Sequence, residues 1–187
     1  NIIAAINGDY FSSETNQVAG GQILAGSFVN RFAETAASAN LGWKRDGSLF
    51  ISRSGPGSFH RQRIRLKDNI IVPIAGINTG RGSDQLVLYT HHYGAQTRTN
   101  NFGVELLVRA QYPLAPGKII QGEVLEKKEK RGGMPLPFGC VVLSAHGRAA
   151  QALQNVKPGE ILTIELPIDA TDSPLTQKAP AANWDGT

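Results

Sequence analysis

The sequence predicts an α+β fold in which a mostly antiparallel β-sheet is accompanied by few, short helices. Three observations predict it. Short apolar runs rich in β-branched residues recur along the 187 residues, Gly and Pro separate most of these runs, and only two segments have helical character. Hydrophobic residues make up 41% of the chain, which is enough for the core of one domain of ordinary size.

Nine segments are predicted to be strands, because each combines an apolar run with flanking turn residues. They are 2–6, 49–52, 61–66, 69–77, 85–90, 103–110, 118–125, 139–144 and 161–167. Their close spacing is typical of a domain dominated by a sheet.

Two short helices are predicted, over 27–38 and over 148–155. The second is rich in Ala and is followed by Pro158-Gly159, which stops a helix. The segment 170–187 is rich in Pro, Ala, Thr and Asp and is predicted to be a linker-like tail. The chain starts directly on the apolar run 2–6 without a Met, so we expect a processed chain from which an upstream segment has been removed.

The composition argues against several classes of partner. The net charge of +4 comes from 19 basic and 15 acidic residues that are interspersed, so no nucleic-acid partner is expected. No run of about 18 apolar residues occurs, so no membrane span is expected. Cys140 is the single cysteine and lies in an apolar run, which predicts a buried thiol without a disulfide or a cysteine zinc site.

Basic residues recur at every second position at Arg61, Arg63 and Arg65, within a predicted strand. A period of two places them on one face. That face is either an ordinary exposed strand face or a surface that meets an anion such as a phosphate.

The first polar cluster that could carry chemistry follows the strand 2–6. Asn7 can donate and accept hydrogen bonds, Asp9 can accept a proton or hold a hydroxyl, and Gly8 between them permits a tight turn. The alternative is an ordinary turn with Asx hydrogen bonds.

A second polar stretch follows the strand 85–90. It contains Thr97 and Arg98, a pairing of hydroxyl and guanidinium that suits a sugar and a phosphate. His91 and His92 would point to opposite faces of an extended chain, so they are not expected to share a metal. A long hairpin loop remains the alternative.

Two further candidates are Glu105 and His146. Glu105 lies in the apolar strand 103–110, where a carboxyl group is expected to be paired or functional and a desolvated one suits general acid catalysis. An outward position on an alternating strand is the alternative. His146 and Arg148 stand at the start of the predicted helix, where the imidazole could shuttle a proton or bind an anion. A structural histidine near a helix end is the alternative.

Several of these runs, taken in order along the chain, resemble the phosphodiester glycosidase family. They are Asn7-Gly8-Asp9-Tyr10-Phe11, Gly20-Gly21, Asp46-Gly47, Ile77-Asn78, Leu88-Tyr89-Thr90 with the Thr-rich loop to Thr97, Gly103-Val104-Glu105, Leu143-Ser144-Ala145-His146-Gly147 and Lys157-Pro158-Gly159-Glu160. Further runs of the family, Gly-Gly-Xaa-Pro, Arg-Thr-Ala and Asp-Gly-Gly-Gly-Ser, are not found after Trp184-Asp185-Gly186. The resemblance therefore implies the N-terminal part of such a domain over 1–187, incomplete at its C-terminal end.

The resemblance implies a secreted or extracytoplasmic hydrolase that cleaves a sugar from a phosphodiester. The family includes enzymes that remove N-acetylglucosamine from mannose-6-phosphate diesters. Among the candidates, Glu105, His146 and Asp9 would then be catalytic, and Asn7, Thr97, Arg98 and Arg148 would bind the substrate.

Activity is expected to need a C-terminal half that would be a partner of this part. The alternative is a non-catalytic module that binds a glycan or a cell-wall polymer. No metal ligands are predicted, and no cofactor can be named from the sequence.

Overall fold

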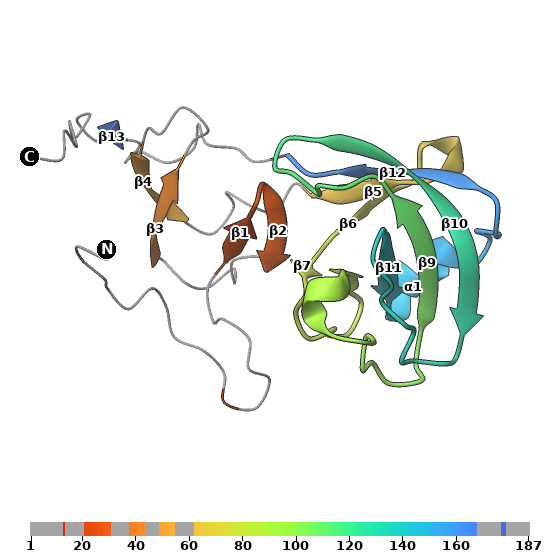
Figure 1. The fold of residues 1–187 in the computed structure, drawn as a ribbon. Helices are drawn as coiled ribbons and strands as arrows, with labels where there is room; N and C mark the ends of the chain where they lie inside the picture. The colour runs from red at the N-terminus through yellow and green to blue at the C-terminus, as the bar shows by residue number, and fades with distance from the viewer. Residues whose placement is uncertain are drawn as a thin grey trace, which may run out of the picture.

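The computed structural model describes Ser13 and residues 21–30, 38–43, 49–54, 62–167 and 177–178 (Figure 1). The largest described part is a curled, mostly antiparallel sheet with one α-helix, so the predicted α+β class is confirmed. The predicted strand 2–6 lies outside the described residues.

Eight strands form the main sheet, in the order β6-β5-β12-β10-β9-β11-β8-β7. All neighbours are antiparallel except β7 and β8, which are parallel. The strands are β5 (Arg63–Arg65), β6 (Ile71–Pro73), β7 (Gly76–Ile77), β8 (Leu86–Tyr89), β9 (Val104–Ala110), β10 (Ile119–Glu129), β11 (Cys140–Ala145) and β12 (Ile161–Glu165). Each falls in or overlaps a predicted strand, and β10 runs beyond its predicted end through the alternating charges at 126–129.

One chain segment forms both ends of this sheet. β6 pairs with β5 at one end, and β7, which follows three residues later, pairs with β8 at the other. The two residues between them continue the pairing, because Ile74 N donates to Gln62 O and Ala75 N donates to Leu86 O. The curled sheet therefore closes on itself through 71–77, where the sequence predicted one continuous strand.

The inner face of the closed sheet holds the main core. Alternate residues of β9 and β11 point inward and are buried, among them Leu106, Val108 and Leu143. Helix α1 (Gly147–Leu153) adds Leu153 to the same core. The helix predicted over 148–155 is confirmed with a shift of one to two residues.

A second, smaller core covers the outer face of β8, β9 and β11. It contains Val87, Tyr89 and Val142 from the sheet and Met134 and Leu136 from the segment before β11. Outward-facing residues of these strands are therefore enclosed as well. This enclosure positions the candidate site described below.

The helix predicted over 27–38 is wrong at both of its described ends. β2 (Ser27–Asn30) pairs with β1 (Gln22–Leu24), and β3 (Ser38–Trp43) begins at the other end. Phe28 is fully buried, and its N–H donates to Leu114 O, 86 residues further along the chain. Such long-range pairing overrides a local helical preference. Residues 31–37 lie outside the described part.

The remaining described strands form a small sheet in which β4 (Leu49–Ser54) lies between β3 and β13 (Gln177–Lys178). β13 belongs to the segment predicted as a linker-like tail. Two 3-10 turns lie in the connections between strands of the main sheet: η1 (Lys67–Asn69) between β5 and β6, and η2 (His91–Tyr93) between β8 and β9. None of the helices in the described residues has the length and apolar character required to cross a membrane.

Candidate functional site

Glu105 is the centre of a buried hydrogen-bonded group of side chains. It faces outward from β9, as the alternation of the strand dictates, yet it is fully buried, because the segment around Met134 covers this face. Its Oε1 accepts hydrogen bonds from Thr99 Oγ1 and from Ser144 Oγ, both at 2.8 Å, and its Oε2 accepts one from Met134 N at 3.0 Å. Both carboxyl oxygens are thus held by donors.

Two threonines extend this group toward the loop after η2. Thr97 is buried, and its Oγ1 lies 3.2 Å from Thr99 Oγ1. Met134 N also donates to Thr97 Oγ1, at 3.1 Å, and Thr97 N donates to Met134 O. The loop and the covering segment are therefore fastened to each other and to Glu105.

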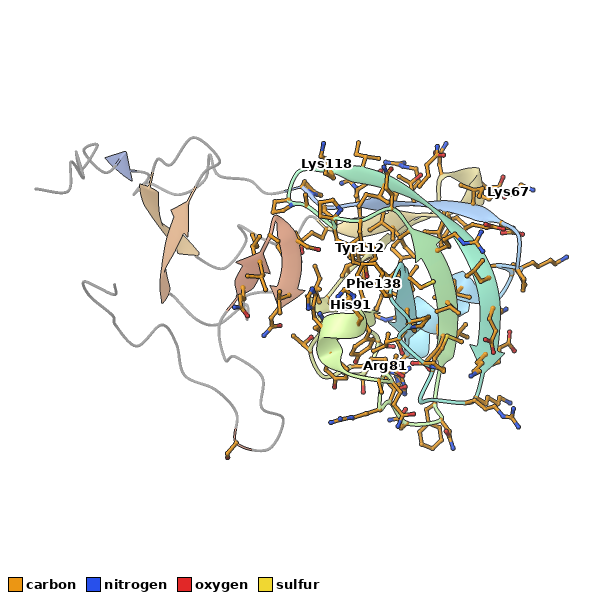
Figure 2. The ribbon with its side chains drawn as sticks, in the orientation of Figure 1. Lys67, Arg81, His91, Tyr112, Lys118 and Phe138 are labelled. Atoms are coloured by element: carbon orange, nitrogen blue, oxygen red, sulfur yellow. The ribbon has the colours of Figure 1, made fainter. Side chains whose placement is uncertain are left out.

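Arg81 reaches the same group from the loop before β8. Its Nη1 donates to Ser144 Oγ at 2.8 Å, and its Nη2 donates to Asn100 Oδ1 at 2.6 Å and to Phe102 O at 2.9 Å. Arg81 thereby joins its own loop to β11 and to the loop before β9, at the end of the sheet where β9 begins (Figure 2). We call Arg81, Thr97, Thr99, Glu105 and Ser144 the Glu105 cluster.

The cluster contains a basic group, Arg81, and an acidic group, Glu105, in surroundings that are partly shielded from water. Burial lowers the pKa of Arg81, although the negative charges of Glu105 and of an ionised Tyr89 act in the opposite direction. Burial is also the main reason that the pKa of Tyr89 is raised, so its phenol stays protonated at neutral pH. Charges here are screened less by water than those on the surface.

Gly103 allows the strand to begin close to this cluster. Its φ is +147°, and a Cβ atom at this position would lie 2.1 Å from Ala145 O and 2.9 Å from Arg81 Nη1. A side chain would therefore collide with the backbone of β11.

His146 and Arg148 lie beside the cluster and not within it. His146 directly follows Ala145, whose carbonyl oxygen accepts a bond from Arg81 Nη1 at 3.4 Å. The His146 ring Nδ1 is buried and has no hydrogen-bond partner in the described part of the chain. Asp84 caps helix α1 by accepting from Arg148 N at 2.8 Å, while the Arg148 side chain is 84% exposed.

Arg98 lies between the two threonines of the cluster but is exposed to solvent. Its φ of +52° turns the backbone, so that the side chain leaves the buried group. The structure thus joins Thr97 to Glu105 and puts Arg98 next to them in the chain. Asn7 and Asp9 lie outside the described residues.

The basic face predicted on the strand 61–66 holds an internal carboxylate. Arg63 Nε and Arg65 Nε lie 2.5 and 2.9 Å from the two oxygens of Glu165. Burial raises the pKa of Glu165, but the hydrogen bonds and charges of both arginines outweigh it, and the net pKa is lowered. These two guanidinium groups therefore bind a carboxylate of the neighbouring strand β12. Arg61 lies outside the described residues.

No group of three or more His, Cys, Asp or Glu side chains in the described ranges could hold a metal ion. The Cys140 thiol is buried at the start of β11, and burial raises its pKa. It has the character expected of a packing residue.

Comparisons with solved structures support the fold. The chain is similar to a crystal structure of a hypothetical protein from Synechocystis, with a TM-score of 0.59 and 14% identity over 85% of this chain and 27% of that one. It is also similar to one described as a "Putative exported protein" from Burkholderia pseudomallei K96243, with a TM-score of 0.52 and 16% identity over 78% and 32%. At these identities the likeness concerns the fold alone.

The chain therefore spans about a third or less of the length of either similar protein. No family model matches the sequence, and no curated protein matches it.

Arg81 was not predicted from the sequence, although its side chain donates more hydrogen bonds in this region than those of Arg98 and Arg148, which were predicted. The sequence does contain a signal, because Arg81 stands between Gly80 and Gly82, four residues before the start of the predicted strand 85–90. Its partners Ser144 and Asn100 are 63 and 19 residues away. Only the register of the sheet brings them together.

Proposed function

We propose that this chain carries part of the substrate site of a hydrolase that releases a sugar from a sugar phosphodiester. The observation that supports this most is the Glu105 cluster, in which one fully buried carboxyl group is surrounded by hydroxyl groups and an arginine. A network of this kind holds a loop in a fixed geometry, which a substrate site requires.

The chemistry needs charge stabilisation more than strong acid catalysis. The bond between the anomeric carbon and a phosphate oxygen breaks, water supplies the hydroxyl group of the sugar and a proton, and the departing phosphate carries the electron pair. A phosphate is a good leaving group, so positive charge near its oxygens is the main requirement. Arg98 is exposed next to the fixed Thr97 and Thr99 and is suited to this task.

Glu105 and His146 take different roles in this proposal. The Glu105 carboxyl is enclosed and held by three donors, so it acts as a positioning residue through the threonine loop and Ser144. The Nδ1 atom of His146 has no hydrogen-bond partner among the described residues, and His146 remains our candidate for proton transfer. Asn7, Asp9 and Arg148 remain predicted site residues.

The test is hydrolysis of an alkyl diester of N-acetylglucosamine-1-phosphate by this chain and by the longest natural protein that contains it. We expect sugar release from the longer protein, and a fall in kcat of about a hundredfold for Arg98→Ala, with partial rescue by Arg98→Lys. Arg131→Ala, another exposed arginine, is the matched control. Lack of sugar release by both proteins, or an Arg98→Ala variant as active as the wild type, would contradict the proposal.

The role of Glu105 is tested by a kinetic measurement that a purely structural residue would leave unchanged. We expect Glu105→Gln to lower kcat and leave KM within about threefold at a temperature where the variant is fully folded. An unchanged kcat in that folded variant would remove Glu105 from the site.

We also propose an extracytoplasmic location. The fold likeness to a protein described as exported supports it. Fractionation of the native organism tests it: we expect the protein outside the cytoplasmic fraction, and recovery in the cytoplasm would contradict the proposal.

A further inference from the structure

Three aromatic rings from separate parts of the chain gather at one place on the surface of the sheet. They are His91 from η2, Tyr112 after β9 and Phe138 before β11 (Figure 2). The Phe138 centroid lies 5.0 Å from that of His91 and 5.7 Å from that of Tyr112. We call these three residues the aromatic platform.

The platform combines a fixed base with an open face. The rings of Tyr112 and Phe138 are nearly parallel, with an interplanar angle of 20°. Tyr112 is fastened by its hydroxyl, which donates to Cys140 O at 3.0 Å. Phe138, in contrast, is 79% exposed, more than any other large hydrophobic side chain of the described residues. The platform therefore presents a largely exposed aromatic ring on a fixed base, and a ligand that covers this ring would gain the free energy of burying its apolar surface.

We propose that the aromatic platform binds a pyranose ring of a glycan by stacking against Phe138. The apolar face of a pyranose carries several C–H groups, which are attracted to the negative face of an aromatic ring. The hydroxyl groups at the rim of the sugar need polar partners, and His92 lies beside the platform, with its ring centroid 4.1 Å from that of His91. His92 is exposed and can donate or accept.

The electrostatics favour a neutral sugar over a phosphate-bearing nucleotide. Partial loss of hydration at the exposed His92 lowers its pKa, and the neighbouring His91 lowers it further, so the imidazole is neutral at neutral pH. Burial raises the pKa of Tyr112 to about 12, so its phenol carries no charge. The nearby Arg109 is already paired with Glu123 at 2.9 Å. A nucleic acid would need several free cations at this surface, and Arg109 is not one of them.

This site goes beyond the proposed hydrolysis, because the platform shares no residue with the Glu105 cluster. Binding is measured without turnover, so the two proposals can fail separately. A chain that binds a glycan keeps this inference whatever its turnover, and the hydrolase is removed only if the longer natural protein also releases no sugar.

The experiment is a titration of the whole chain with tetrasaccharides of N-acetylglucosamine, of β-linked glucose and of α-linked glucose, followed by NMR or calorimetry. We expect binding to at least one of them and a loss of about threefold to tenfold in affinity for Phe138→Ala. Phe102→Ala is the matched control, since Phe102 is 70% exposed and lies outside the platform. It should bind like the wild type.

Phe138→Trp gives a second, non-disruptive variant, because the larger ring should retain or strengthen binding. Circular dichroism establishes that each variant is folded before it is titrated. The proposal is overturned if no tetrasaccharide binds, if folded Phe138→Ala binds as well as the Phe102→Ala control, or if a thymidine oligonucleotide binds at the platform more tightly than every sugar.

Discussion

Ser144 lies opposite Glu105 in the register of β11 and β9, and its hydroxyl donates to Glu105 Oε1 while accepting from Arg81. One serine thus connects a buried carboxyl group to a guanidinium group that reaches the surface. The stability of this end of the sheet should depend on that connection more than on any exposed ion pair.

Replacing Glu105 with Gln should destabilise the protein by about 1–3 kcal/mol. The N–H of Met134 cannot rotate and holds the amide oxygen of the variant at the Oε2 position, so the NH2 group takes the place of Oε1, the acceptor for Thr99 and Ser144. Both hydroxyl groups then have to reorient, and Ser144 must do so while it accepts from Arg81. Urea unfolding measures the difference. Glu123→Gln, at the exposed ion pair with Arg109, is the control and should cost about 1 kcal/mol or less. Equal losses in the two variants would contradict the account of a buried network.

Arg81→Lys should cost about 1–3 kcal/mol even though the charge is kept. A single ammonium group cannot donate at once to Ser144, Asn100 and Phe102, which diverge around the planar guanidinium group. Arg148→Lys should change the free energy of unfolding by about 0.5 kcal/mol or less, because that side chain is mostly solvated. Thermal or urea unfolding of both variants compares them directly, and a harmless Arg81→Lys would show that charge alone matters here.

Gly103→Ala should be more harmful than Gly117→Ala. Both positions have a positive φ, so both substitutions bear a backbone cost, which is about 1 kcal/mol for the left-handed region near Gly117 and about 1–3 kcal/mol for the less populated conformation of Gly103. Only at Gly103 would the new Cβ meet another backbone atom, Ala145 O, whereas nothing lies within 4 Å at Gly117. We expect a further loss of at least about 1–2 kcal/mol for Gly103→Ala in denaturant unfolding. Similar losses at the two sites would mean that β9 and β11 can separate freely here.

The pair of arginines on Glu165 predicts an acid-sensitive contribution to stability. The folded pKa of Glu165 is lowered below the value of 4.5 for an unperturbed group. The stabilisation is therefore fully present above about pH 4.5 and is lost as the pH falls through the folded pKa. Urea unfolding of the wild type and Glu165→Gln between pH 7 and pH 3 measures this. The difference between them should shrink below about pH 4.5, and a constant difference would contradict the account.

Much of the sheet could be predicted from the sequence, because apolar, β-branched runs and their turns are local signals. Glu105 could be singled out for the same reason, since a carboxyl group among Val and Leu residues is unusual. The helix predicted from Ser27 failed because the partners of that segment, 22–24 and Leu114, are set by tertiary pairing. Arg81 was missed because its contacts depend on register. The covering segment around Met134 carries no local sign that it encloses Glu105.

The closed sheet has a consequence for how this protein behaves at high concentration. Its two terminal strands, β6 and β7, are three and two residues long and belong to the same short segment. Between β5 and β8 the sheet therefore offers hardly any unpaired backbone for a strand of another molecule to join. Self-association by strand addition, the usual route from a β-rich fold to fibrils, should begin at this closure only after 71–77 has come away from both of its neighbours, and the other open edge is the charged end of β10 at 126–129, which pairs with β9 alone.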